Sequence, residues 1–93
     1  MNTEDIFTEL THDLQQLKVD VFKDKDVTSI DILNYLKDRY GEDATMKLYY
    51  IPMEDLHLIS VNKDNMIVVL KIDLAERDIE LIKGARCSQI EGV

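Results

Sequence analysis

Apolar positions near the N-terminus recur first with the period of a helix and then with that of a strand. Ile6, Leu10 and Leu14 recur every four residues, which predicts an amphipathic helix. In the following segment, residues 17–22, apolar and polar side chains largely alternate. Alternation is typical of a half-buried strand, so this segment is predicted to be a short strand that pairs within a sheet.

A second helix is predicted to begin after residue 28. Thr28 or Ser29 can supply the capping oxygen, and Gly41 is a natural C-terminal stop. Between these ends the apolar residues form one stripe at helical spacing. The stripe consists of Ile32, Leu33, Leu36 and Tyr40.

The rest of the chain has the pattern of strands. Strands are predicted over residues 46–51, 56–61 and 66–72, and the polar residues 62–65 between the last two predict an antiparallel hairpin. The strand over residues 66–72 is apolar on both faces, which predicts a central strand covered on both sides. Residues 75–83 fit two structures, an edge strand over 78–82 after a turn or a helix over the whole segment.

These elements predict an α+β fold over residues 1–93 as a single domain. Two helices would pack on one face of an antiparallel sheet of four to five strands, in the order α-β-α-β-β-β-(β). Residues 85–93 have little pattern, and we expect them to form a loose C-terminal tail.

The net charge of the chain favours a function in binding other proteins. The chain has 19 acidic and 11 basic residues, a formal net charge of −8 at pH 7. Such a domain repels nucleic acid and membrane surfaces and is steered toward basic surfaces of other proteins. Apolar residues make up 45% of the chain, which excludes a disordered acidic tail because such tails are poor in apolar residues.

The single cysteine indicates a reducing compartment. Cys87 has no partner for an intramolecular disulfide, and neither a basic cluster nor a histidine surrounds it in sequence, so we interpret it as an ordinary thiol. The N-terminus lacks a signal peptide pattern, and no apolar run approaches the roughly 18 residues of a membrane span. A cytoplasmic protein is the expectation.

Patterns typical of catalysis, metal binding or cofactor binding are missing. His12 and His57 are far apart and lack the spacing of a zinc site, and the three glycines form no phosphate-binding loop. Basic residues are interleaved with acidic ones, as in residues 23–26 and 37–39, which argues against direct nucleic-acid binding. We therefore expect a protein that is not an enzyme and that has no metal and no cofactor.

The order of elements, together with the charge, resembles the phage uracil-DNA glycosylase inhibitors, which are small acidic DNA mimics. Five fragments fall at corresponding places, with residues 4–7 at the start of the first helix and residues 16–19 at the start of the first strand. The other three, residues 55–60, 68–73 and 78–82, fall on the late strands. The Glu-Ser-Ile edge of that family is absent, and its nearest equivalents here are Asp24, Asp26 and Val27.

The resemblance implies a function, a compartment and a set of contact residues. The protein would occupy the DNA groove of a uracil-DNA glycosylase in the cytoplasm of a bacterial host cell and so assist host takeover by a phage. Such an enzyme flips its target base, and many push an apolar wedge into the duplex. Two groups of residues are then predicted to contact the enzyme. Carboxylates that meet phosphate-binding donors would be Asp20, Asp24 and Asp26, with Val27 beside them, and the pocket for the wedge would be formed by Ile32, Leu33, Leu36 and Leu58.

Other interpretations remain open. The same apolar residues are also what the core of any α+β domain requires. As for function, the acidic surface suits an immunity or antitoxin-type protein that neutralises a basic nuclease, or an acidic interaction module without inhibitory activity.

Overall fold

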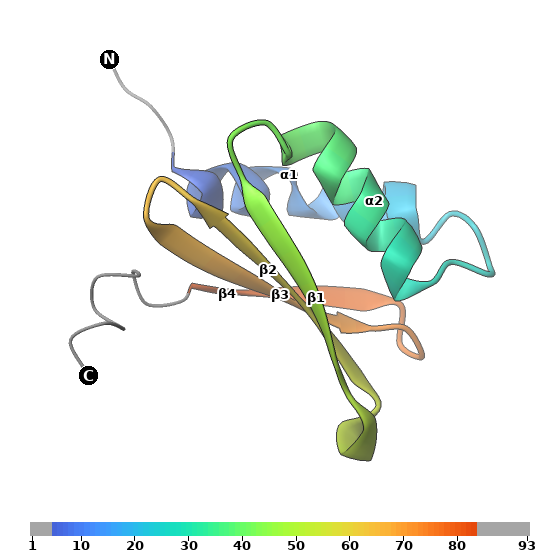
Figure 1. Cartoon of the computed structure of the whole chain (residues 1–93). Coiled ribbons are helices and arrows are strands. Elements are labelled where there is room, and N and C mark those ends of the chain that lie inside the picture. Colours follow the sequence, from blue (N-terminus) through green and yellow to red (C-terminus); the bar gives the residue numbers. More distant parts are fainter. Residues whose placement is uncertain (1–4, 84–93) are drawn as a thin grey trace.

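The structure, a computed structural model, describes residues 5–83 and contains two helices and one four-stranded antiparallel sheet in this part of the chain (Figure 1). This arrangement confirms the predicted α+β class. In chain order the elements are α1 (Ile6–Val21), α2 (Ser29–Tyr40), β1 (Thr45–Ile51), a short 3-10 turn η1 (Pro52–Glu54), β2 (Leu56–Lys63), β3 (Met66–Asp73) and β4 (Asp78–Lys83). The predicted loose tail over residues 85–93 and the interpretation of Cys87 lie outside the described residues.

The strand predicted over residues 17–22 is wrong, because α1 continues through this segment to Val21. Leu17 and Val21 are buried four residues apart, and Val19 between them is 63% exposed. Over five residues an alternating pattern and a helical stripe can coincide, and here the stripe that begins at Ile6 and Leu10 simply continues. The order of elements is therefore α-α-β-β-β-β.

Both helices begin at capping side chains. The Asp5 carboxylate accepts a hydrogen bond from the backbone N–H of Thr8 at 2.8 Å. At the start of α2, Thr28 and Asp31 form a reciprocal capping box, with distances of 3.2 and 3.0 Å. The helix ends at Gly41, as predicted, where a Cβ atom would overlap with the carbonyl oxygen of Lys37.

The four strands form a meander in which each pairs with the next one along the chain. β2 and β3 form the predicted hairpin, in which Lys63 pairs with Met66. Asp64 and Asn65 at its turn both have positive φ, 54° and 64°, which is the conformation of a type I′ turn. The ambiguous C-terminal segment is a strand, because Ile79 of β4 pairs with Ile72 of β3 and thereby buries its side chain.

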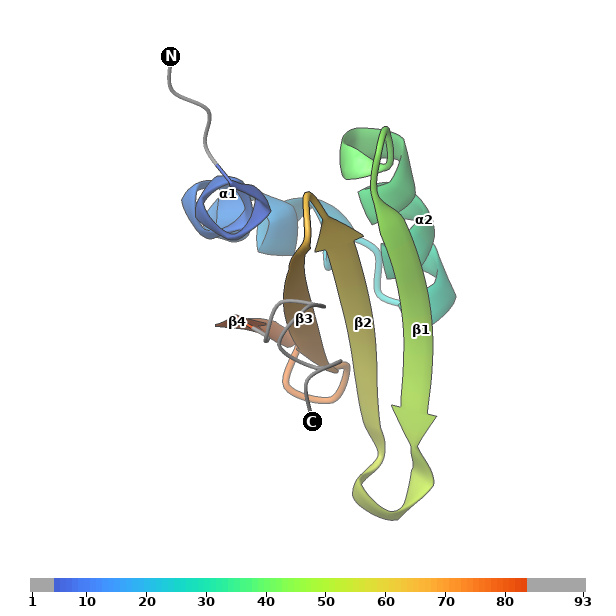
Figure 2. The same cartoon turned by 60° about the vertical axis from the view of Figure 1, so that its left-hand side comes forward.

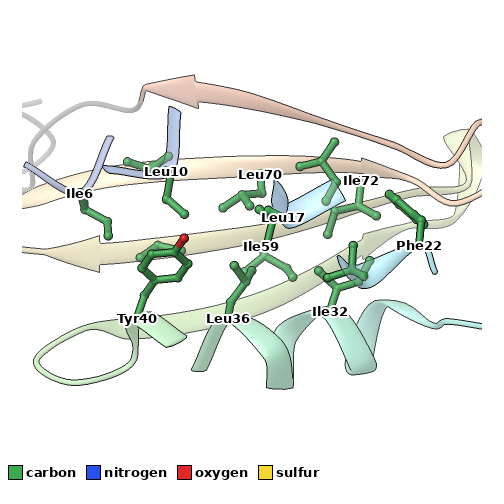
Figure 3. Packing of buried hydrophobic residues seen from close by; sticks show 14 of the residues in the cluster. Ile6, Leu10, Leu17, Phe22, Ile32, Leu36, Tyr40, Ile59, Leu70 and Ile72 are labelled. Atoms are coloured by element: carbon green, nitrogen blue, oxygen red, sulfur yellow. The ribbon is translucent and has the colours of Figure 1, made fainter. Parts of the chain in front are cut away.

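Both helices cover the same face of the sheet (Figures 1 and 2). The core lies between them and the inward side chains of β2, β3 and β4. Figure 3 shows side chains of both helices meeting those of β2 and β3. Among residues 5–83, the largest fully buried side chains are Leu10, Leu17, Ile32, Leu36, Ile59, Val61, Val68, Leu70, Ile72 and Ile79. The interpretation of Ile32 and Leu36 as core residues is confirmed.

The prediction that β3 is covered on both sides is wrong for the described residues. β3 is an inner strand, but no helix of residues 5–83 lies on the second face of the sheet (Figure 2). Ile67 and Val69 of β3 point to this open face and are half-buried. Cross-strand neighbours such as Ser60 and Ile82, which pair with Val69, provide their partial cover.

Candidate acidic binding surface

A pocket of about 250 Å³ lies where α1 ends and α2 begins. Its lining combines carboxylates with two valines and a tyrosine ring, which gives it both charge and an apolar part. The lining residues are Asp20, Val21, Asp24, Val27, Asp31 and Tyr35. Three of the predicted contact residues, Asp20, Asp24 and Val27, therefore meet at one site.

The connection between the helices is held against the turn between β3 and β4. The Arg77 guanidinium lies 5.3 Å from the centre of the Phe22 ring and donates to the carbonyl oxygen of Asp24 at 3.5 Å. Phe22 itself is buried. The Asp24 carboxylate accepts from the backbone N–H of Asp26 at 3.4 Å, a local turn contact. Asp24 and Asp26 are exposed on this fixed connection.

Asp20 is engaged within the protein. Its carboxylate accepts hydrogen bonds from the hydroxyl of Tyr35 at 2.7 Å and from the Gln16 amide at 3.0 Å, and the Arg39 guanidinium is 3.9 Å away. These contacts, the Tyr35 hydrogen bond foremost, lower the pKa of Asp20. Burial, followed by the hydrogen bond to Asp20, raises the pKa of Tyr35. Asp20 thus joins α1 to α2, and its oxygen atoms are less available to a partner than those of Asp24.

A second tyrosine–aspartate pair joins the same two helices. The hydroxyl of Tyr40 donates to Asp13 at 2.7 Å, and burial together with this hydrogen bond raises the pKa of Tyr40. Arg39 lies between the two tyrosines, with its guanidinium 5.9 Å from the Tyr35 ring centre and 5.8 Å from that of Tyr40. These contacts of Tyr35, Tyr40 and Arg39 between the helices were not predicted from the sequence. Their available signal was the seven-residue spacing of Asp13 and Asp20, which places both on one face of α1.

Asp31 is a site residue that was not predicted from the sequence. It lines the pocket and its second role is structural, because one carboxylate oxygen accepts from the backbone N–H of Thr28. Its side chain is thereby held at the start of α2, where the helix dipole favours a negative charge. Asp26 is adjacent to the pocket in sequence but does not line it.

The structure does not bring the four predicted wedge-binding residues into one pocket. Ile32 and Leu36 are fully buried in the core, and Leu33 packs against the core cluster. Leu58 lies on the open face of the sheet, because its neighbour Ile59 is the residue that points to the helices. The apolar part of the acidic pocket consists of Val21, Val27 and the Tyr35 ring instead.

The histidines are not part of this site. His12 is exposed on α1, and the His57 ring stacks on that of Tyr50 at 4.6 Å between centroids. Among residues 5–83, no group of three or more His, Cys, Asp or Glu side chains is arranged to hold a metal ion. Neither of the two described helices is long and apolar enough to cross a membrane.

Comparisons with known proteins give no relative. No family model, no curated protein and no solved structure matches this chain. The resemblance to glycosylase inhibitors therefore stays a prediction, and any function has to be argued from the site itself.

Proposed function

We propose that this chain is an acidic binding protein that mimics DNA and occupies the basic DNA-binding groove of a DNA-acting enzyme. The specific candidate is a bacterial uracil-DNA glycosylase. One observation carries the proposal: Asp24 and Val27 on the connection between the helices and Asp31 in the first turn of α2 surround a single pocket.

The carboxylates of this surface are held before any partner arrives. Asp31 is fixed by the capping box, and Asp24 by its contact with the backbone of Asp26. Groups that bind DNA phosphates are hydrogen-bond donors and cations, and a fixed carboxylate is a strong acceptor for both. A rigid acidic protein also avoids the energy that an enzyme spends on bending DNA and unstacking a base.

The pocket suits a basic side chain of the groove better than the apolar wedge that the resemblance implied. Three carboxylates surround it, and an apolar wedge would remove water from them without replacing their hydrogen bonds. Lysine and arginine have an aliphatic stem and a charged head. The stem would lie against Val21 and Val27, and the head would meet Asp24 and Asp31.

The test is a uracil-excision assay on duplex DNA with this protein added at stoichiometric amounts. We expect inhibition by the wild type and roughly tenfold weaker inhibition by the double variant Asp24→Asn/Asp26→Asn, because charge-assisted contacts are lost. The matched control is Asp38→Asn/Asp43→Asn, which changes the net charge equally at exposed positions outside the pocket. It should inhibit like the wild type.

Two results would reject the proposal. Full excision at a several-fold excess of wild type, with glycosylases from more than one bacterial source, would exclude the candidate enzyme. Equal losses in the two double variants would show that net charge alone, and not the pocket, governs binding. In the first case, inhibition of a basic nuclease by the same surface becomes the function to test.

A further inference from the structure

The hairpin of β1 and β2 projects beyond the rest of the sheet. β1 and β2 pair with each other as far as Ile51 and Leu56, but β2 pairs with β3 only from His57, whose partner is Ile72. Residues 51–56 therefore lie beyond the last pair between β2 and β3. Figures 1 and 2 both show the tip as the part of the chain farthest from α1. The tip is therefore accessible from several sides.

Several contacts hold the tip in one conformation. The hydroxyl of Tyr50 donates to the Asp55 carboxylate at 3.0 Å, and the backbone N–H of Asp55 donates to the carbonyl of Pro52 at 3.2 Å. Asp55 has φ 50°, in the left-handed region that a residue with a side chain rarely adopts. Across the strands, the Tyr50 ring stacks on His57 with an interplanar angle of 30°.

Met53 stands at the end of this structured tip and is 96% exposed, more than any other large apolar side chain of the described residues. Glu54 follows it and is also exposed. A methionine adapts its shape to an apolar pocket, and a tip that is already ordered loses little entropy when it binds. The neighbouring carboxylate adds a requirement for positive charge at the rim of such a pocket.

We propose that this tip is a second contact element, in which Met53 enters an apolar pocket of the partner and Glu54 meets basic side chains at its rim. The inference rests on the proposed function, since the partner is the same enzyme. α2 and β1 pack on each other and run in opposite directions, so the start of α2 and the end of β1 lie toward the same end of the molecule (Figure 1). One partner surface can therefore meet both the acidic pocket and the tip.

The experiment is a binding titration of purified bacterial uracil-DNA glycosylase with wild type and with variants of the tip. Met53→Ala and Met53→Gln, the second of which keeps the length of the side chain, should each weaken binding roughly tenfold, as expected for an apolar anchor. Tyr50→Phe keeps the ring but removes the hydrogen bond to Asp55, and it should weaken binding about threefold because the tip becomes less ordered. The control is Ile82→Thr, which removes an exposed apolar group at the other edge of the sheet and should bind like wild type.

The outcomes separate the two proposals. Wild-type affinity in both Met53 variants, with the Asp24→Asn/Asp26→Asn protein impaired, would overturn the role of the tip and leave the acidic surface intact. Failure of the wild type to bind the enzyme would overturn both. Unchanged thermal unfolding of the variants would show that a loss of binding arises at the tip and not from loss of the fold.

Discussion

The hydroxyl of Tyr35 in α2 donates a hydrogen bond to the carboxylate of Asp20 in α1 at 2.7 Å, across the rim of the acidic pocket. Asp20 is among the residues predicted from the sequence to contact a partner. In the folded chain the same carboxylate also joins the two helices. The shape of the pocket thus depends on a contact between the elements that form it.

Replacement of Asp20 by Asn should make stability less dependent on acidic pH. The folded-state pKa of Asp20 lies below its ordinary value of 3.8, so its contribution is complete above that pH and is lost as the pH falls through the folded-state value. Urea unfolding of wild type and Asp20→Asn between pH 7 and pH 2.5 measures the effect. The variant should be less stable at pH 7, and the two curves should converge in acid. A constant difference at all pH values would contradict the assigned cause.

Tyr40→Phe should destabilise the protein by about 1.5 kcal/mol at pH 7. The variant keeps the buried ring of Tyr40 but loses the hydrogen bond from its hydroxyl to the Asp13 carboxylate. Alkaline pH gives an independent measurement. The pKa of Tyr40 is raised in the folded state, so its contribution is present below the ordinary value of 10.0 and is lost as the pH rises above it. The stability of wild type should thus fall more steeply above pH 10 than that of the variant, as measured by urea unfolding.

The sequence predicted the sheet well because each strand has one residue set that must face the core. In β2, for example, Ile59 and Val61 are separated by the polar Ser60, and a shift of one residue would expose both. The turn residues Asp64 and Asn65 then fix the hairpin. Residues 78–82 were ambiguous only because a short segment fits both periods, and pairing with β3 decides between them.

The site was less predictable, for two physical reasons. The segment 17–22 was assigned to a strand, and that error hid the fact that Asp20 lies two helical turns from Asp13 on the same face. Contacts between side chains of different helices, such as those made by Tyr35 and Tyr40, also depend on how the helices pack, which local periodicity does not specify. Asp24 and Val27 could be predicted as neighbours because the short connection between the helices keeps them close.

Gly41→Ala should destabilise the protein by about 1–3 kcal/mol, the usual cost of inserting a group into occupied space. The added methyl group would overlap with the carbonyl oxygen of Lys37, so the end of α2 has to shift. The helical φ of −73° at this position means that the effect arises from space and not from a left-handed backbone. Thermal or urea unfolding provides the measurement, and wild-type stability would show that the end of α2 moves freely.

Asn65→Gly should stabilise the protein by about 0.5–1 kcal/mol, because a left-handed residue with a side chain is strained and glycine is not. Asn65 has φ 64° at the second position of the turn between β2 and β3, where type I′ hairpins prefer glycine. Asn34→Gly, in the exposed interior of α2, is the control and should be destabilising, by about 0.3 kcal/mol. Destabilisation by Asn65→Gly would indicate that the asparagine side chain makes a necessary contact in the turn.

The kinetics of binding should separate the acidic pocket from the hairpin tip. Electrostatic steering acts before contact and falls with ionic strength, so the association rate of wild type with the partner enzyme should decrease strongly between low and physiological salt. Asp24→Asn/Asp26→Asn should reduce both this rate and its dependence on salt.

Met53→Ala removes an uncharged contact that forms only in the complex, and it should therefore raise the dissociation rate and leave the association rate unchanged. Stopped-flow or surface-based kinetics at several salt concentrations measure both rates. An association rate that does not change with salt would contradict steering by the carboxylates, and a slower association of Met53→Ala would contradict the role given to the tip.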